Sequence, residues 1–204
     1  MTISVGIYLF PDVEVLDFAG PYEVFSAADR VGRRQGAAPL FRVFTVARKP
    51  GPVRARAGLV VQPDYVLAEH PAMDVLVVPG GVIEAELECP EVSRWIAAQH
   101  AAGSIVASVC TGVFLVARTG LLDGLAATTH HEDAAQLQAM FPTILVMPER
   151  RWIDHGTVVS SAGIAAGMDM SLHLVGRLTK GALATATARQ LALAGHEPRA
   201  GEQA

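Results

Sequence analysis

The sequence contains few cysteines and few aromatic residues. Only two of the 204 residues are cysteine, and aromatic residues make up 6% of the chain. Disulfide frameworks belong to small secreted domains, whereas a chain of this size builds a hydrophobic core without them. We therefore expect Cys89 and Cys110 to be unpaired thiols. Cys89 lies in the polar stretch ELECPEV, where we interpret it as an incidental residue of a turn before Pro90.

Charge and long apolar runs are also scarce. Charged residues make up 18% of the chain, the net charge is -4, and the basic residues cluster only at Arg30, Arg33 and Arg34. This excludes a basic surface for nucleic acid. No apolar run approaches the ~18 residues of a membrane span, and the N-terminus lacks the basic and apolar segments of a signal peptide. We expect a cytoplasmic protein that binds neither nucleic acid nor membrane.

Hydrophobic residues make up 51% of the chain, enough for one well-filled core. We expect a single domain over residues 1–195 and a polar tail over 196–204. Short apolar runs alternate with stretches of helical spacing. Buried strands are predicted at 3–10, 41–47, 73–81 and 104–110. A hairpin is predicted at 53–65, a short strand at 124–131, and strands around the turn at 154–156. Helices are predicted at 16–32, 91–103, after Gly112, at 132–141 and from Ala162.

This alternation predicts an α/β fold with a mostly parallel, doubly wound sheet and helices on both faces. Binding sites in such sheets lie at the carboxyl ends of the strands. Four features of the sequence follow predicted strands: Asp17, the pair Gly80-Gly81, Cys110 and His130. We expect these loops to meet in one site.

Cys110 occupies a corner in SIVASVCTGVFLVARTGLL, where an apolar run ends and Thr111-Gly112 opens a helical pattern. Such a corner can force a tight elbow that lifts the side chain above the sheet. The N–H groups of the following helix favour a thiolate, and a partly exposed thiol avoids the cost of desolvation. We therefore expect a nucleophilic thiol with a lowered pKa. Amides of Gly80 or Gly81 are candidates to stabilise negative charge on a substrate.

A nucleophile needs a group that handles its proton, and the candidates are Asp17, Glu23, His130 and His131. Leu16 and Phe18 flank Asp17, which favours a raised pKa, although an aspartate before a helix is as often an N-terminal cap. Glu23 falls about two turns later and is expected to be solvated. Consecutive histidines such as His130 and His131 point to opposite faces of an extended chain, and no HExxH or CxxC spacing completes a metal site. We expect no metal.

Several of these segments together resemble the ThiJ/PfpI superfamily of class I glutamine amidotransferase-like domains, closest to its isonitrile hydratase branch. They are LFPDVEVLDFAGPYEVF at 9–25, PGG at 79–81, SVCTG at 108–112, ATTHH at 127–131 and SAGIAAGMD at 161–169. The resemblance covers nearly the whole chain. It implies a flavodoxin-like homodimer that acts on a small-molecule substrate without cofactor or metal.

The resemblance also assigns roles to residues. It implies that Cys110 is the nucleophile, that Asp17 contacts it, and that His130 lies near the thiol. Thr111 stands where the protease-like branch carries a histidine, which disfavours peptidase activity. His131 replaces an aromatic residue that is common in isonitrile hydratases, so the pocket wall differs there. In the implied reaction Cys110 adds to the terminal carbon of an isonitrile, and Asp17 delivers a proton and activates water. Amides near Gly81 and Thr111 hold the polarised intermediate, and an N-formamide is released.

Two other functions compete with this reading. The segment SAGIAAGMDMSLHLVGRL is also similar to the sensor domains of AraC-type regulators, which favours a module that binds a small molecule without turnover. A chain of 204 residues leaves no room for the helix-turn-helix pair of such regulators, so we expect no direct DNA binding. A glyoxalase-like or deglycase-like activity would use the same thiol, but it tends to require glutamate at the position of Asp17.

Overall fold

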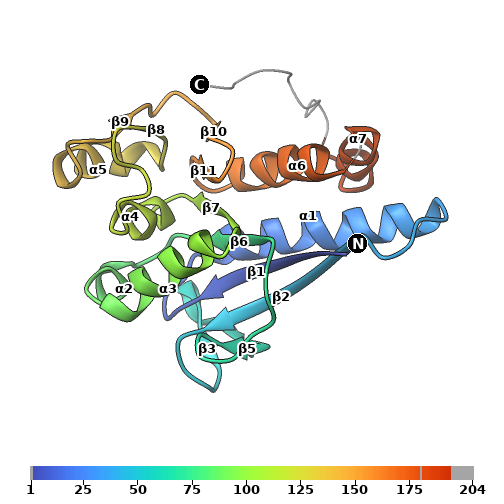
Figure 1. The fold of residues 1–204 in the computed structure, drawn as a ribbon, viewed down its shortest axis with the longest axis horizontal. Coiled ribbons are helices and arrows are strands. Elements are labelled where there is room, and N and C mark those ends of the chain that lie inside the picture. Colours follow the sequence, from blue (N-terminus) through green and yellow to red (C-terminus); the bar gives the residue numbers. More distant parts are fainter. Residues whose placement is uncertain (1, 180, 194–204) are drawn as a thin grey trace.

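One seven-stranded sheet forms the centre of the molecule (Figure 1). The structure is a computed structural model that describes residues 2–179 and 181–193. In spatial order the strands are β10 (Trp152–Asp154), β11 (Val158–Ser161), β7 (Ile105–Val109), β6 (Val75–Val78), β1 (Ile3–Leu9), β2 (Phe41–Ala47) and β5 (Tyr65–Val66). Only the β10–β11 pair is antiparallel. The sheet confirms the predicted fold class. The tail predicted at 196–204 and the boundary at 195 lie outside the described residues.

Helices cover both faces of this sheet. On one face α1 (Val15–Arg34), α6 (Ala166–Leu178) and α7 (Gly181–Gln190) pack against one another, and α1 and α6 also contact the strands. On the other face lie α2 (Glu84–Leu87), α3 (Pro90–Ala101) and α4 (Gly112–Ala117), of which α3 and α4 contact β7 (Figure 1). Such a sandwich buries both sides of the central strands, which explains why β1, β6 and β7 are apolar along most of their length.

Smaller elements flank the sandwich. A hairpin of β3 (Val53–Arg54) and β4 (Val60–Val61) encloses the 3-10 turn η1 (Arg56–Gly58). A second small sheet joins β8 (Ala126–Ala127) to β9 (Leu145–Val146), with η2 (His131–Asp133) and α5 (Ala134–Met140) between them. The strand predicted at 124–131 therefore exists only as Ala126–Ala127, and it lies in this small sheet outside the main one.

The helices differ from prediction mainly at their ends. The helix after Cys110 ends at Ala117, because Thr119 hydrogen-bonds the carbonyl of Val116 at 2.6 Å and Gly120 takes a positive φ of 79°. α6 begins at Ala166 rather than Ala162, since the amide of Ala162 still bonds to Arg151 at the end of the sheet. No helix among residues 2–179 and 181–193 is long and apolar enough to cross a membrane.

Candidate active site

The loop after β1 and the loop after β6 are joined by backbone hydrogen bonds at the carboxyl edge of the sheet. The amide of Glu14 donates to Gly80 O at 2.8 Å, and the amide of Val82 donates to Asp12 O at 3.1 Å. Gly81 lies at φ 143°, where a Cβ atom would stand 2.4 Å from Asp12 O. Glycine is required at 81 because the two backbones approach so closely. This junction holds the start of α1 beside the Pro79-Gly80-Gly81 loop.

Cys110 forms the predicted elbow between β7 and α4. Its φ is 56°, a left-handed conformation that non-glycine residues rarely adopt. Neighbouring groups hold it there: its amide donates to Ser161 O at 3.1 Å, and its carbonyl accepts from Thr129 Oγ1 at 3.0 Å. A Cβ at Gly112 would stand 2.1 Å from Val78 O, so only glycine lets the helix start this close to β6. Strain of this kind is typical of functional positions.

Asp17 lies in the first turn of α1 and is fully buried, with 0% of its surface exposed. Its Oδ2 accepts from the amide of Gly80 at 3.1 Å, and the carboxyl group also interacts with the Cys110 thiol. No group in the described part of the chain hydrogen-bonds its other oxygen, Oδ1. Burial raises the pKa of Asp17 to about 7, which confirms the expected shift. Glu14 is the N-cap of α1, so Asp17 is not the cap.

The state of the Cys110 thiol differs from the expectation. The side chain is 7% exposed, and burial together with the neighbouring Asp17 charge raises its pKa to about 12. The Thr111 amide opposes this rise, but more weakly. α4 has only 6 residues, so its dipole is small. The expected exposed thiol with a lowered pKa is therefore wrong. The site holds a protonated thiol beside a carboxyl group that titrates near neutral pH.

Gly80 and Gly81 do not offer their amides to a ligand. The Gly80 amide binds Asp17, and the Gly81 amide donates to Thr111 Oγ1 at 2.9 Å. The Thr111 hydroxyl in turn donates to Gly81 O at 3.1 Å. The expectation that these two amides face the substrate is wrong, because they already position the acid and fasten the loop to the elbow. Thr111 lies where it can hold this loop in place.

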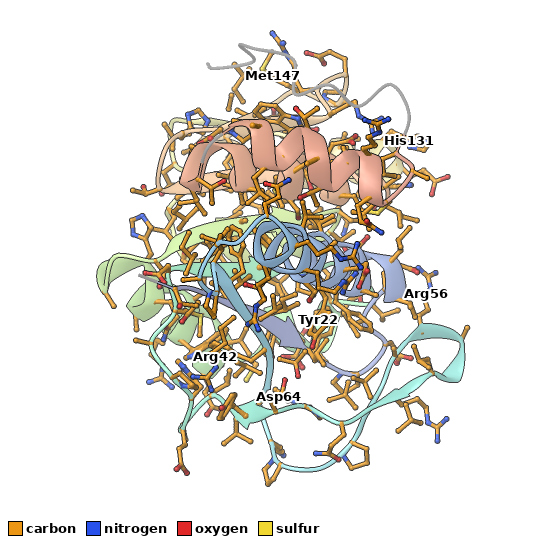
Figure 2. The ribbon with its side chains drawn as sticks, turned by 90° about the vertical axis from the view of Figure 1, so that its right-hand side faces the viewer. Tyr22, Arg42, Arg56, Asp64, His131 and Met147 are labelled. Atoms are coloured by element: carbon orange, nitrogen blue, oxygen red, sulfur yellow. The ribbon has the colours of Figure 1, made fainter. Side chains whose placement is uncertain are left out.

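His130 lies beside the thiol, and Gly163 makes room for both. A Cβ at Gly163 would stand 2.9 Å from Cys110 Sγ and 2.7 Å from His130 Cδ2. The rings of His130 and His131 are 4.4 Å apart, so the expectation that they point to opposite faces is wrong. The reason is that His131 begins the 3-10 turn η2 rather than continuing an extended strand. His131 and Arg56, from the hairpin, lie on the same side of the molecule (Figure 2).

Sequence reasoning missed several residues of this site. Gly163 follows β11, the strand that pairs with β7, so its place after a strand was a usable signal. Asp133 follows His130 by three residues, and its Oδ2 lies 3.6 Å from Nδ1 of the His130 ring. The spacing of three residues was the only sign of this contact in the sequence. Glu23 lies outside the site, half-exposed and paired with Arg30, as expected. Among the described residues no group of His, Cys, Asp or Glu is arranged to hold a metal ion.

Cys89 is not the incidental residue that the sequence suggested. It is the N-cap of the 12-residue helix α3, half-buried beside Arg48. Burial raises the pKa of Cys89, but hydrogen bonds from Arg48 and from the amides of Val92 and Glu91 outweigh this, and the net pKa is lowered. The contact between Cys89 and Arg48, which directly follows β2, could not be predicted from the sequence.

The two thiols are therefore expected to differ in reactivity. At pH 7.5 iodoacetamide should modify Cys89 at least about 10-fold faster than Cys110, since thiolate is the reactive form and Cys110 is both protonated and buried. Mass spectrometry of the two peptides over time measures the order. A Cys89→Ser variant should retain only the slow reaction. Faster labelling of Cys110 would contradict the raised pKa.

The fold and the site together define the class of this protein. The fold is a doubly wound α/β sandwich, and the site holds a cysteine on a strained elbow that faces a buried acid. The chain belongs to the DJ-1/PfpI family, whose model matches residues 3–177. It is 32% identical over 182 residues to the isonitrile hydratase of Pseudomonas putida, covering 87% of this chain and 73% of that enzyme. A crystal structure of a ThiJ/PfpI family protein from Pseudomonas syringae superposes with a TM-score of 0.82 at 25% identity, covering 95% of this chain and 76% of that one.

Regulators are also among the similar proteins. The chain is 33% identical over 174 residues to the HTH-type transcriptional regulator GbdR of Pseudomonas aeruginosa, covering 85% of this chain but only 46% of the regulator. An AraC family transcriptional regulator from Pseudomonas putida shares the fold, with a TM-score of 0.81 at 24% identity over 93% of this chain and 99% of that one. The family thus includes both enzymes and regulators.

Proposed function

We propose that the protein hydrates isonitriles to N-formamides, with Cys110 as the nucleophile and Asp17 as the group that transfers its proton. The observation that carries this proposal is the contact between a buried, protonated thiol and a buried carboxyl group of pKa about 7. The similarity to an isonitrile hydratase supports the choice of substrate. The proposal includes a cytoplasmic homodimer, for which the exposed apolar side chains of Leu16, Leu59 and Val60 offer surface.

The chemistry of the substrate suits this pair. The terminal carbon of an isonitrile, R–N≡C, accepts both a nucleophile and a proton. Asp17 takes the proton from the Cys110 thiol as the sulfur attacks, and passes it to the same carbon. The S–H bond breaks, S–C and C–H bonds form, and a thioimidate, R–N=CH–S–Cys110, results. Water then attacks that carbon, the C–S bond breaks, and the formamide and the thiol are released.

This first half-reaction requires Asp17 as a carboxylate and Cys110 as a thiol. A free thiolate is therefore unnecessary, because the acid removes the proton only while the S–C bond forms. Thr111 and Gly80 act as positioning residues in this scheme, since they fix the loop and the acid respectively. Gly81 completes the same loop.

Turnover of two substrates tests the proposal. Wild type, Cys110→Ala and Asp17→Asn are incubated with cyclohexyl isocyanide and with methylglyoxal, and Cys89→Ala serves as the matched thiol control. We expect formamide from wild type and Cys89→Ala only, because only Cys110 contacts the acid. Turnover of isocyanide by Cys110→Ala would refute the nucleophile, and turnover of methylglyoxal alone would favour the carbonyl chemistry.

A sensor function is the second candidate, and the similarity to GbdR favours it. In that case the same site binds a small molecule and releases it unchanged. Titration calorimetry with cyclohexyl isocyanide separates the two functions. Binding without formamide production, equally strong in Cys110→Ala, would favour the sensor over the enzyme.

A further inference from the structure

The His130 ring presents different edges to two different environments. Its Nδ1 faces acids on η2, 3.6 Å from Asp133 Oδ2 and 3.9 Å from Glu132 Oε2. The Cδ2 edge, to which Nε2 belongs, lies against Gly163 beside the Cys110 sulfur. No hydrogen bond occupies Nε2 within the described part of the chain. An imidazole with an acid 3.6 Å from Nδ1, and with Nε2 on the side of a sulfur, is arranged for proton transfer at that sulfur.

Asp133 is better placed than Glu132 to hold this ring. The amide of Asp133 donates to His130 O at 3.0 Å, so the turn itself fixes the acid below the imidazole. The Asp133 side chain is 31% exposed, whereas that of Glu132 is 76% exposed, so the Glu132 charge is largely screened by water. The Asp133 charge also reaches the thiol, where it contributes to the raised pKa of Cys110.

Access to water separates His130 from Asp17. Asp17 has no exposed surface, and Gly80 and Cys110 occupy its surroundings. The His130 side chain is 22% exposed, so its ring reaches both solvent and the neighbourhood of the sulfur. Of the two groups, His130 is therefore the one that water can reach from solvent.

We propose that His130 activates the water that hydrolyses the thioimidate, and that Asp133 is the positioning residue that orients His130 for this step. The inference rests on the proposed function and assigns its two half-reactions to different residues. Asp17 serves the addition of the thiol, and His130 serves its release.

The proposed step balances in atoms and charge. Neutral His130 takes a proton from water at Nε2 as the water oxygen bonds to the thioimidate carbon, and returns that proton to the substrate nitrogen. The hydroxyl proton of the resulting adduct then passes to sulfur as the C–S bond breaks and the carbonyl forms. The groups that face His130 during this cycle are Cys110, the ring of His131, Glu132 and Asp133.

Rapid quenching and intact-protein mass spectrometry test whether the two half-reactions depend on different residues, with cyclohexyl isocyanide as the probe. His130→Gln should form the Cys110 adduct within about 3-fold of the wild-type rate but release formamide about 10²-fold more slowly, so the adduct accumulates. Asp133→Asn should accumulate it at about 10-fold slower release, and Asp133→Glu should recover most of the wild-type rate. Glu132→Gln, the matched control, should turn over like wild type.

Other outcomes overturn the inference. Equal slowing of adduct formation and release in His130→Gln, with no accumulation, would place His130 in the first step or in the structure alone. A Glu132→Gln variant as slow as Asp133→Asn would remove the specific role of Asp133. Unchanged release in both variants would show that another group activates the water. A wild-type protein that forms neither adduct nor formamide would refute the proposed function itself, and the inference with it.

Discussion

Asp17→Asn is expected to lower turnover by ~10²–10⁴-fold and, above pH 7, to stabilise the fold. Burial raises the pKa of Asp17 from its usual 3.8 to about 7. Between these values the folded state binds a proton that the unfolded state has released, so the carboxylate destabilises the fold increasingly as pH rises from 4 to 7 and fully above 7. Asparagine removes this penalty. At pH 8 we expect a gain of ~1–3 kcal/mol, reduced by the amide's own unsatisfied group.

Urea denaturation at pH 4 and at pH 8, with formamide assays in parallel, measures both effects. Near pH 4 the folded side chain is neutral and the unfolded carboxyl group is only about half ionised, so most of the stability gain should be lost. Activity should fall ~10²–10⁴-fold, the range of general acid-base catalysis. Glu23→Gln, on the same helix but half-exposed, is the matched control and should change neither quantity. A variant less stable than wild type at pH 8 would contradict the account of Asp17 as a buried charge.

Gly163→Ala is expected to lower turnover about 10²-fold while leaving the protein folded. The new Cβ would stand 2.9 Å from Cys110 Sγ and 2.7 Å from His130 Cδ2, so at least one of these side chains has to move. A displacement of about 1 Å at a reacting group is enough for such a loss. Gly163 lies in a loop at a negative φ, so alanine adds no backbone strain of its own.

The formamide assay and thermal unfolding separate loss of function from loss of fold in this variant. Gly181→Ala is the matched control, because a Cβ at Gly181 meets no atom within 4 Å and the residue lies in α7. Alanine there should leave turnover unchanged and stabilise the helix by a few tenths of a kcal/mol up to about 1 kcal/mol. Wild-type turnover in Gly163→Ala would mean that the sulfur and the imidazole are not held against this glycine.

The positions of the main strands and of the elbow were predictable from the sequence because they depend on local patterns. A continuous apolar run marks a strand that is buried on both faces, as in β1 and β2. The elbow at Cys110 follows from a strand that ends where Thr111-Gly112 opens a helix. For Asp17 the sequence left a raised pKa and a helix cap equally open. Leu16 beside it is exposed, and the burial that raises the pKa comes with the contacts to Gly80 and Cys110.

The state of the thiol was not predictable, because it depends on contacts between distant segments. His130 and Gly163 lie 20 and 53 residues further along the chain and cover Cys110. Because they exclude water, the burial that raises the pKa of the thiol outweighs the effect of the short helix, which lowers it. The orientation of the Gly80 and Gly81 amides likewise depends on the junction with the loop after β1. The close approach of the two histidine rings required the turn η2, whose bounds the apolar pattern does not reveal.

The measurement that tests the central claim most directly is the site of covalent attachment during turnover. Wild-type protein is mixed with cyclohexyl isocyanide, quenched in acid before the first turnover is complete, digested and mapped by mass spectrometry. The account predicts one added isocyanide on the peptide that contains Cys110 and none on the peptide that contains Cys89. Formamide production while the Cys110 peptide stays unmodified at every quench time, together with turnover by Cys110→Ala, would contradict it.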